Sequence, residues 1–193
     1  MNLVERVKRI LLNPRAEWEV IHAEATTPQA LYTGYIMPLA AIGPVALVIR
    51  LSVFGMRVPF GGAVYRVPIG SLATSTVVRY VLTLVGVYVL ALIIDGLAPT
   101  FGGTPNRIQA LKVAAYSSTA AWVAGIFAIV PALSILGILG LYSLYLLYLG
   151  LPVLMKAPSE KAVAYTVLVI VAAIVLFFVI GIVVGRFIAY PVG

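Results

Sequence analysis

The chain alternates long apolar runs with short polar segments, and this pattern predicts five membrane-spanning helices. The apolar runs cover residues 31–54, 74–97, 108–130, 133–151 and 162–185. A helix needs about 20 consecutive apolar residues to cross the hydrocarbon core of a bilayer, and each run approaches or exceeds that length. The runs are continuous and do not alternate apolar with polar positions, as the strands of a membrane barrel would. The sequence therefore predicts an all-α, polytopic membrane protein.

Prolines indicate where these helices are irregular. Pro38 and Pro44 lie inside the first run, and each removes a backbone hydrogen bond, so we expect a kink there. The third and fourth runs have almost no polar residues between them, and together they are too long for one crossing at about 1.5 Å per residue. We expect the chain to turn at Pro131–Ser134.

The polar segment before the first run predicts a separate pair of short helices. Leu3, Val7, Ile10 and Leu11 share one helical face, and charged residues occupy the other sides. Asn13-Pro14 is a typical helix start. We expect residues 1–27 to form amphipathic helices on the cytosolic membrane surface, ahead of a transmembrane domain at 28–193. Residues 55–73 form a long loop that could be a hairpin around Gly61-Gly62.

Composition agrees with a membrane protein and limits its partners. The chain is 63% hydrophobic and 10% charged, with a mean hydropathy of +1.12, which excludes a water-soluble domain. The net charge is +7, but the basic residues are scattered over span ends and loops. This scatter favours anionic lipid head groups as partners and disfavours nucleic acid. There is no cysteine, so disulfides are excluded.

Charge distribution also predicts the orientation. With the N-terminus inside, the inner segments carry more basic residues than the outer ones. These inner residues are Arg6, Lys8, Arg9, Arg15, Arg107, Lys112, Lys156 and Lys161. We therefore expect a multi-pass protein of the plasma membrane, with a cytoplasmic N-terminus and, after five spans, an external C-terminus.

Four segments together resemble the prokaryotic members of the Yip1 family. Asn13-Pro14, Trp18, Ile21 and Glu24 are similar to the family's NP…W..I..E segment. Ala98-Pro99 with Phe101-Gly102-Gly103 resembles its AP.FGG turn. The segments Ala115–Trp122 and Tyr142–Pro152 resemble its third-span and fourth-span signatures.

The resemblance implies five spans and a cytosolic N-terminus. Eukaryotic members of the family are linked to trafficking between the endoplasmic reticulum and the Golgi and bind Rab GTPases. Their N-terminal Tyr-Gly-Pro motif is absent from this chain, so the resemblance does not extend to GTPase binding.

Asp95 is the only acid inside a long apolar run, and it has two interpretations. A carboxylate in a membrane span is expensive to insert, at about 2.5–3.5 kcal/mol at mid-bilayer, and often handles ions or protons. Asp95 is near the cytosolic end of its span, however, where it could pair with Arg107 or Lys112. The hydroxyls of Tyr116, Ser117, Ser118 and Thr119 could line a solute path with it, although such hydroxyls more often join helices.

Glu19 and His22 are three residues apart and therefore share a helical face, as metal ligands do in carboxylate-bridged iron proteins. The chain contains one histidine, so a complete site would need further ligands from Glu24, Asp95 or a second subunit. A solvated helix face is the simpler interpretation. We expect no cofactor.

Three functional hypotheses follow from the sequence. The favoured one is a non-enzymatic membrane protein that organises lipids, a membrane-protein partner or a homo-oligomer, with Arg6, Lys8, Arg9, Trp18 and Glu24 at the contacting surface. The second is transport: an ion or solute channel or carrier that uses Asp95. The third is a metal-binding membrane enzyme at Glu19 and His22.

Overall fold

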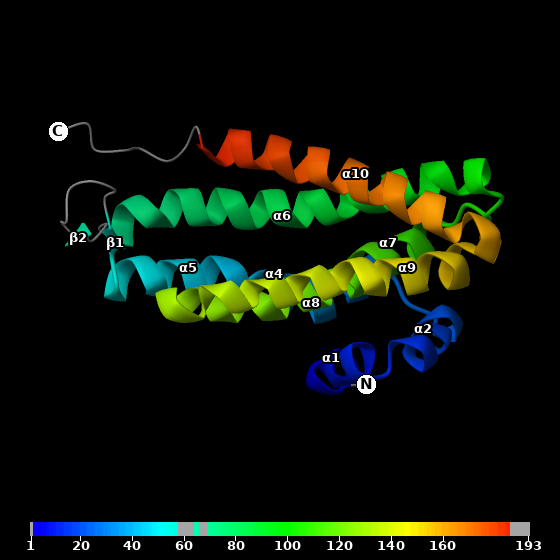
Figure 1. Cartoon of the computed structure of the whole chain (residues 1–193), viewed down its shortest axis with the longest axis horizontal. Coiled ribbons are helices and arrows are strands. Elements are labelled where there is room, and N and C mark those ends of the chain that lie inside the picture. Colours follow the sequence, from blue (N-terminus) through cyan, green and yellow to red (C-terminus); the bar gives the residue numbers. More distant parts are fainter. Residues whose placement is uncertain (1, 58–63, 66–68, 186–193) are drawn as a thin grey trace.

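Five long apolar helical segments run side by side in the computed structural model, which describes residues 2–57, 64–65 and 69–185 (Figure 1). Their length and composition suit membrane crossing. They are Pro28–Val53, Ala73–Phe101, Arg107–Ile129, Pro131–Met155 and Ser159–Gly185. The predicted five-span, helical architecture is confirmed, and each predicted run falls on one of these segments.

The first span is broken into short pieces around its prolines, as predicted. It consists of α3 (Pro28–Leu31), a π-helical turn at Tyr32–Ile36, α4 (Met37–Ala40) and α5 (Ile42–Val53). Pro38 cannot donate to the preceding turn, and the wider turn directly before it accommodates that loss. The hydroxyl of Tyr80 donates to the carbonyl of Met37 at 3.0 Å, so a neighbouring span shares the backbone acceptors at this irregular point.

Two short antiparallel strands follow the first span. They are β1 (Met56–Arg57) and β2 (Val64–Tyr65), with Met56 opposite Tyr65 and Arg57 opposite Val64. These strands agree with the predicted hairpin. The turn expected at Gly61-Gly62 lies outside the described residues.

The other four spans include 3-10 segments in the second, third and fourth. The second span is α6 (Ile69–Leu97) followed by a 3-10 turn at Ala98–Phe101, and the fifth is α10 (Ser159–Gly185). The third comprises α7 (Arg107–Ser117), α8 (Thr119–Ala124) and a 3-10 segment at Gly125–Ile129. The fourth comprises a 3-10 segment at Pro131–Leu141 and α9 (Tyr142–Met155). The reversal at Pro131 is where the sequence predicts it.

The third span is the centre of the bundle. Residues 110–117 of α7 are all buried, and half of its most apolar window is buried, a larger share than in the other spans. Small residues allow close approach on this span: a Cβ on Gly125 would lie 3.3 Å from the Cα of Gly43. Gly140 of the fourth span lies equally close to Ala121.

The FGG turn joins the ends of the second and fourth spans. Gly102 has a φ of 74°, a conformation that L residues with side chains rarely adopt. A Cβ on Gly103 would lie 2.7 Å from the carbonyl oxygen of Met155, so there is room only for glycine. The next amide, of Thr104, donates to that same carbonyl at 2.7 Å. The two glycines therefore let the turn bind the end of α9.

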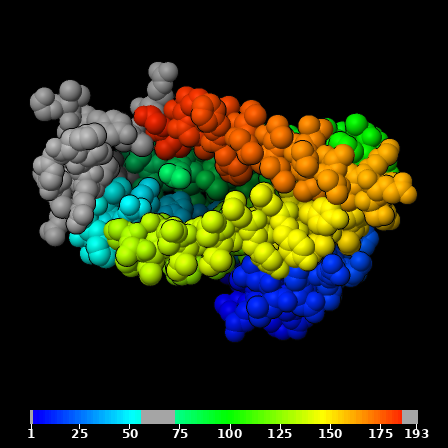
Figure 2. All heavy atoms as spheres, viewed as in Figure 1, coloured from blue at the N-terminus to red at the C-terminus, as the bar shows by residue number. Residues whose placement is uncertain are grey.

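The N-terminal helices α1 (Leu3–Leu12) and α2 (Pro14–Ala23) lie against the flank of the bundle (Figures 1 and 2). They pack near α8 and α9, towards the end of the molecule where the α6–α7 and α9–α10 connections lie. Asn2 caps α1 by accepting from the amide of Val4, and Pro14 is the first residue of α2. The α2 helix ends at Ala23, and Thr27 caps α3.

The apolar face of these helices contacts protein, which corrects the prediction that it lies on the membrane surface. Ile10, Trp18 and Ile21 are fully buried, and Leu3, Val7 and Leu11 pack against the same core. The hydroxyl of Tyr142 on α9 also donates to the carbonyl of Leu11 at 3.2 Å. Burial of apolar area is favourable in either setting, and here the bundle supplies the complementary surface.

Trp18 packs on Gly150 so tightly that we predict strong sensitivity to any side chain there. A Cβ on Gly150 would lie 2.6–2.8 Å from three atoms of the buried indole ring. We expect Gly150→Ala to displace the ring and destabilise the contact between α2 and α9 by about 1–3 kcal/mol, a typical overpacking cost. The expected signs in the purified protein are a lower apparent Tm and red-shifted tryptophan emission.

The control for this prediction is Gly181→Ala, because a Cβ on Gly181 has nothing within 4 Å. That variant should unfold like the wild type. Equal stability of the Gly150→Ala and Gly181→Ala variants would refute the packing argument.

Candidate functional site

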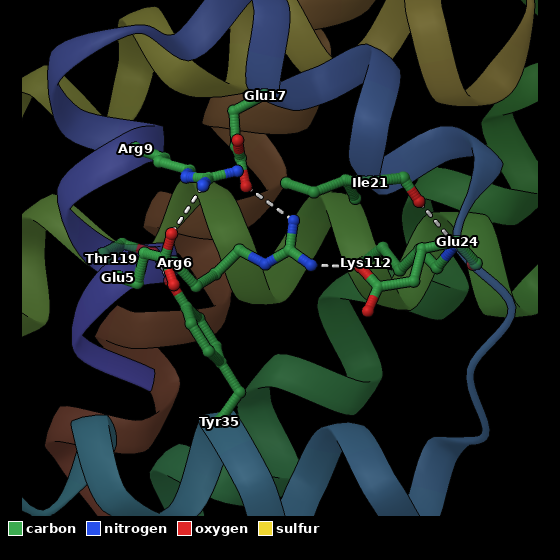
Figure 3. Close-up of polar contacts among 9 residues, drawn as sticks. All are labelled: Glu5, Arg6, Arg9, Glu17, Ile21, Glu24, Tyr35, Lys112 and Thr119. Atoms are coloured by element: carbon green, nitrogen blue, oxygen red, sulfur yellow. Dashed lines mark hydrogen bonds and ion pairs between the residues drawn. The ribbon is translucent and has the colours of Figure 1, made fainter. Parts of the chain in front are cut away.

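Arg6 is a buried arginine at the contact between the N-terminal helices and the bundle (Figure 3). Arg6 is 5% exposed, and its guanidinium lies between the carboxylates of Glu17 and Glu24. One terminal nitrogen donates to Glu17 Oε1 at 2.6 Å, and the other donates to Glu24 Oε2. Arg6 therefore joins α1 to both the start and the end of α2. We call Arg6, Glu17, Glu24, Lys112 and Tyr116 the Arg6 cluster.

Lys112 binds the end of α2 from the centre of the bundle. It lies on α7, is 2% exposed, and donates from Nζ to the carbonyls of Ile21 and Glu24 at 2.7 and 2.6 Å. Gln109, one turn earlier on α7, donates to the carbonyl of His22 at 3.1 Å. The last carbonyls of a helix lack partners within the helix and carry partial negative charge. A cation and an amide from α7 satisfy them here.

Tyr116 supplies the aromatic base of the cluster. The Arg6 guanidinium carbon lies 5.6 Å from the centroid of the Tyr116 ring, within the range of a cation–π contact. Trp18 meets the same ring edge-on at 6.3 Å, and Tyr35 packs against it at 4.5 Å. The Tyr35 hydroxyl in turn shares a 2.7 Å hydrogen bond with Thr119. The cluster thus contacts α1, α2, the π-helical turn and the third span.

Charges in the cluster are balanced: Arg6 and Lys112 oppose Glu17 and Glu24. Charged groups are normally costly to bury, and they persist when each is paired and hydrogen-bonded. Removing one member of a buried ion pair typically costs about 3–5 kcal/mol, because the other charge stays buried alone. The arrangement is suited to fixing the position of α1 and α2, and it offers no nucleophile paired with a base.

The serine and threonine hydroxyls that were predicted to line a solute path hydrogen-bond to carbonyls of their own span. Ser117 and Ser118 both donate to the carbonyl of Ala114, at 3.4 and 2.7 Å, and Thr119 donates to the carbonyl of Tyr116 at 2.7 Å. Such bonds back to the preceding turn bend helices, and the third span is interrupted between α7 and α8 at Ser118. These contacts favour the structural interpretation over a solute path.

Asp95 lies near the last turn of α6 and is only loosely paired. Its Oδ2 is 3.9 Å from Nε of Arg107, whose side chain is 82% exposed. The other carboxylate oxygen is buried and has no hydrogen-bond partner. Lys112, the alternative partner, is bound to the carbonyls of α2. Asp95 is therefore separate from the Arg6 cluster in its contacts.

Glu19 and His22 remain on α2 without further ligands. Among the described residues no group of three or more histidine, cysteine, aspartate or glutamate side chains is placed to hold a metal ion. Glu19 is exposed, and the Nδ1 atom of His22 is buried without a hydrogen-bond partner. The third ligand that the metal hypothesis requires is thus not supplied by the described part of this chain.

Residues that the sequence analysis assigned to two different functions lie in contact in the structure. Arg6, Trp18 and Glu24, predicted at a membrane or partner surface, meet Tyr116, predicted on a solute path. Arg6 and Trp18 are buried, so their predicted surface position is wrong, whereas Lys8 and Arg9 are exposed as expected. Arg9 forms an exposed pair with Glu5, one turn away on α1.

Sequence reasoning missed Glu17, Gln109 and the central position of Lys112. A signal for the buried charges was present in their spacing. Arg6 falls three residues after Leu3 and four before Ile10, on the apolar face of α1, and Glu17 falls four before the buried Ile21. A charge in register with an apolar face indicates a buried partner.

We predict that Arg6→Met releases α1 and α2 from the bundle. The substitution preserves much of the side-chain volume but leaves Glu17 buried without its cation, which typically costs about 3–5 kcal/mol. Amide hydrogen exchange in α1 and α2 should accelerate strongly, while exchange in α6 and α10 stays as in the wild type.

Arg9→Met is the matched control, because it removes an arginine of the same helix from an exposed pair. Such pairs contribute about 0–1 kcal/mol. If Arg9→Met accelerated exchange as much as Arg6→Met, the special role of the buried arginine would be refuted.

Comparison with known proteins places the whole architecture in one family. No curated protein and no solved structure matches the chain. A family model does match, that of the Yip1 domain, over residues 8–181. This range includes the first four spans, the fifth up to residue 181 and most of the N-terminal helices, in agreement with the resemblance of the sequence motifs. The chain therefore belongs to the Yip1 family of integral membrane proteins.

Proposed function

We propose that this protein is a non-enzymatic membrane organiser that gathers anionic lipids around itself through the outer face of α1 and α2. The observation that carries the proposal is the firm attachment of these helices by the Arg6 cluster, which gives their outer face a fixed position at the bundle flank. A fixed, charged face can sort lipids without any chemical step.

The outer face of α1 combines apolar and basic residues. Val4, Lys8 and Leu12 follow each other at four-residue spacing, so they share a face. Val4 is 57% exposed and Leu12 is 83% exposed, and Lys8 and Arg9 are also exposed. Apolar side chains beside cations are typical of helices at the boundary between head groups and acyl chains. The inner face of α1 is used by the protein, and the outer face is free for lipid.

The proposal includes an orientation with the N-terminus in the cytoplasm of a cell whose plasma membrane holds the protein. It is supported by the location of α2 towards the end of the bundle where the α6–α7 and α9–α10 connections lie. Arg107 begins α7, Lys156 follows α9, and Lys161 lies in the first turn of α10. Basic residues concentrate on the cytoplasmic side of membrane proteins. The predicted external C-terminus concerns residues 186–193, which lie outside the described residues.

A lipid-sorting measurement tests this function. A fluorescent donor on Ala16→Cys, an exposed position of α2 in a chain without native cysteine, would report energy transfer to labelled phosphatidylglycerol or phosphatidylcholine in vesicles. Each basic residue near an anionic surface contributes about 1 kcal/mol, so we expect severalfold enrichment of phosphatidylglycerol. The double variant Lys8→Glu, Arg9→Glu should abolish it.

Arg79→Glu provides the control, since Arg79 is exposed near the opposite end of the second span. It should leave the enrichment unchanged. Enrichment that survives in the Lys8→Glu, Arg9→Glu variant would overturn the proposed function.

A conduit for ions or protons is the second candidate function, and one observation favours it. The Oδ1 atom of Asp95 is buried without a partner, as in a carboxylate that exchanges a proton or binds a cation. Opposing this, the hydroxyls of Ser117, Ser118 and Thr119 are occupied by helix carbonyls.

A flux assay decides between these readings of Asp95. For a conduit, vesicles containing the wild type should pass protons or monovalent cations faster than empty vesicles, and Asp95→Asn should return the rate to that of empty vesicles. Arg107→Gln, which removes only the loose partner, should retain the flux. Identical rates for the wild type, Asp95→Asn and empty vesicles would dismiss the conduit.

A further inference from the structure

A cavity of about 360 Å³ lies between α2, α9 and the start of α10, beside Trp18. No member of the Arg6 cluster lines it. Its residues divide into a charged wall from α2 and an apolar wall from the two spans. The charged wall contains Arg15 and Glu19 beside Trp18; the apolar wall contains Leu149, Pro152 and Val153 of α9 and Ala162 of α10. Tyr148 and Ser159 complete the lining.

A bilayer core of ordinary thickness, placed with one edge at the Pro131 turn, puts the cavity at the depth of the lipid head groups. Counted from the turn at Pro131, the 11 residues of the 3-10 segment rise about 22 Å, so a core of about 30 Å ends near the first turn and a half of α9. Counted back from Gly185, about 20 residues of α10 cross the same core. Tyr148, Pro152 and Ser159 then all lie just beyond the hydrocarbon, at the end that carries α1 and α2.

The two charges of the cavity are exposed and are not engaged by protein groups in ion pairs. Arg15 and Glu19 are one helical turn apart, yet neither takes part in any of the ion pairs among the described residues. The indole nitrogen of Trp18 is buried and has no hydrogen-bond partner either. The first amides of α10, at Ser159, add donors at the positive end of a 27-residue helix.

We infer that this cavity binds the head group of a phospholipid that carries both a phosphate and a primary amine, as phosphatidylethanolamine does. The guanidinium of Arg15 and the amides at the start of α10 match the phosphate. The Glu19 carboxylate, one turn along α2, matches the ammonium. Leu149, Pro152 and Val153 give the glycerol and the upper acyl chains an apolar surface. Because the cavity offers both polar groups for the head group and an apolar surface for the chains, its ligand is a whole lipid rather than a soluble phosphate.

This site is independent of the basic outer face of α1. Lys8 and Arg9 do not line the cavity, so the Lys8→Glu, Arg9→Glu variant should bind the aminophospholipid as the wild type does. Failure of the lipid-sorting function and failure of this site are therefore separately measurable.

Native mass spectrometry of the full chain, released from detergent with added lipid, tests the inference. The probes are phosphatidylethanolamine, phosphatidylglycerol, phosphatidylcholine and the soluble head group glycerophosphoethanolamine. In the Lys8→Glu, Arg9→Glu background, which lacks the anionic-lipid face of α1, we expect phosphatidylethanolamine to be preferred over the other two lipids by about tenfold, the effect of one charge-assisted contact. Glu19→Gln should remove this preference, and Arg15→Gln should weaken binding of all three lipids.

Glu5→Gln is the matched control, because Glu5 is an exposed carboxylate on the neighbouring helix and does not line the cavity. Made in the same Lys8→Glu, Arg9→Glu background, it should keep the preference for phosphatidylethanolamine. Because Arg15 and Glu19 are exposed, we expect all three variants to retain the wild-type Tm.

Three outcomes would overturn the inference. An unchanged preference in Glu19→Gln would remove the amine-binding role of that carboxylate. Stronger binding of phosphatidylglycerol than of phosphatidylethanolamine by the Lys8→Glu, Arg9→Glu variant would assign the cavity to an anionic lipid. Competition by glycerophosphoethanolamine as effective as that of the whole lipid would show that the acyl chains contribute nothing.

Discussion

A buried arginine that must be neutralised is the constraint on which the organisation of this protein depends. Arg6 is removed from water and meets two carboxylates of α2, and α7 returns a lysine to the carbonyls at the end of the same helix. Each charge is acceptable only while the others are in place. The N-terminal helices are thus held by groups that cannot separate cheaply, whereas apolar contact alone would allow them to slide along the bundle or onto lipid.

This attachment changes what the N-terminal helices can do. An amphipathic helix that lies freely on a membrane uses its apolar face for lipid. Here that face is consumed by the bundle, through Trp18 on Gly150 and Ile10 in the core. The surfaces left for the proposed lipid contacts are the outer face of α1 and the cavity beside α2. Both are held in a fixed position relative to the spans, because the Arg6 cluster and the Trp18–Gly150 contact attach the two helices to the bundle.

The geometry of the bundle depends on two kinds of close contact. Glycines at 43, 125 and 140 let the first, third and fourth spans approach closely, while Gly102 and Gly103 let the turn after the second span bind the end of α9. Tyrosine hydroxyls then join neighbouring segments, as from Tyr80 to Met37 and from Tyr142 to Leu11. In a membrane these packing and hydrogen-bond contacts replace the hydrophobic driving force.

The sequence by itself determined the five spans, the irregular first span, the turn at Pro131 and the family, because these depend on local length, hydropathy and proline chemistry. Lys8 and Arg9, which the sequence assigned to a membrane or partner surface, are exposed. Only the tertiary structure decided the place of Arg6 and Trp18. Hydrophobic burial has no direction, so the amphipathic pattern of α1 fits lipid and protein equally well. The partner that resolves this choice, Lys112, is 91 residues from Ile21 along the chain, and no local pattern connects them.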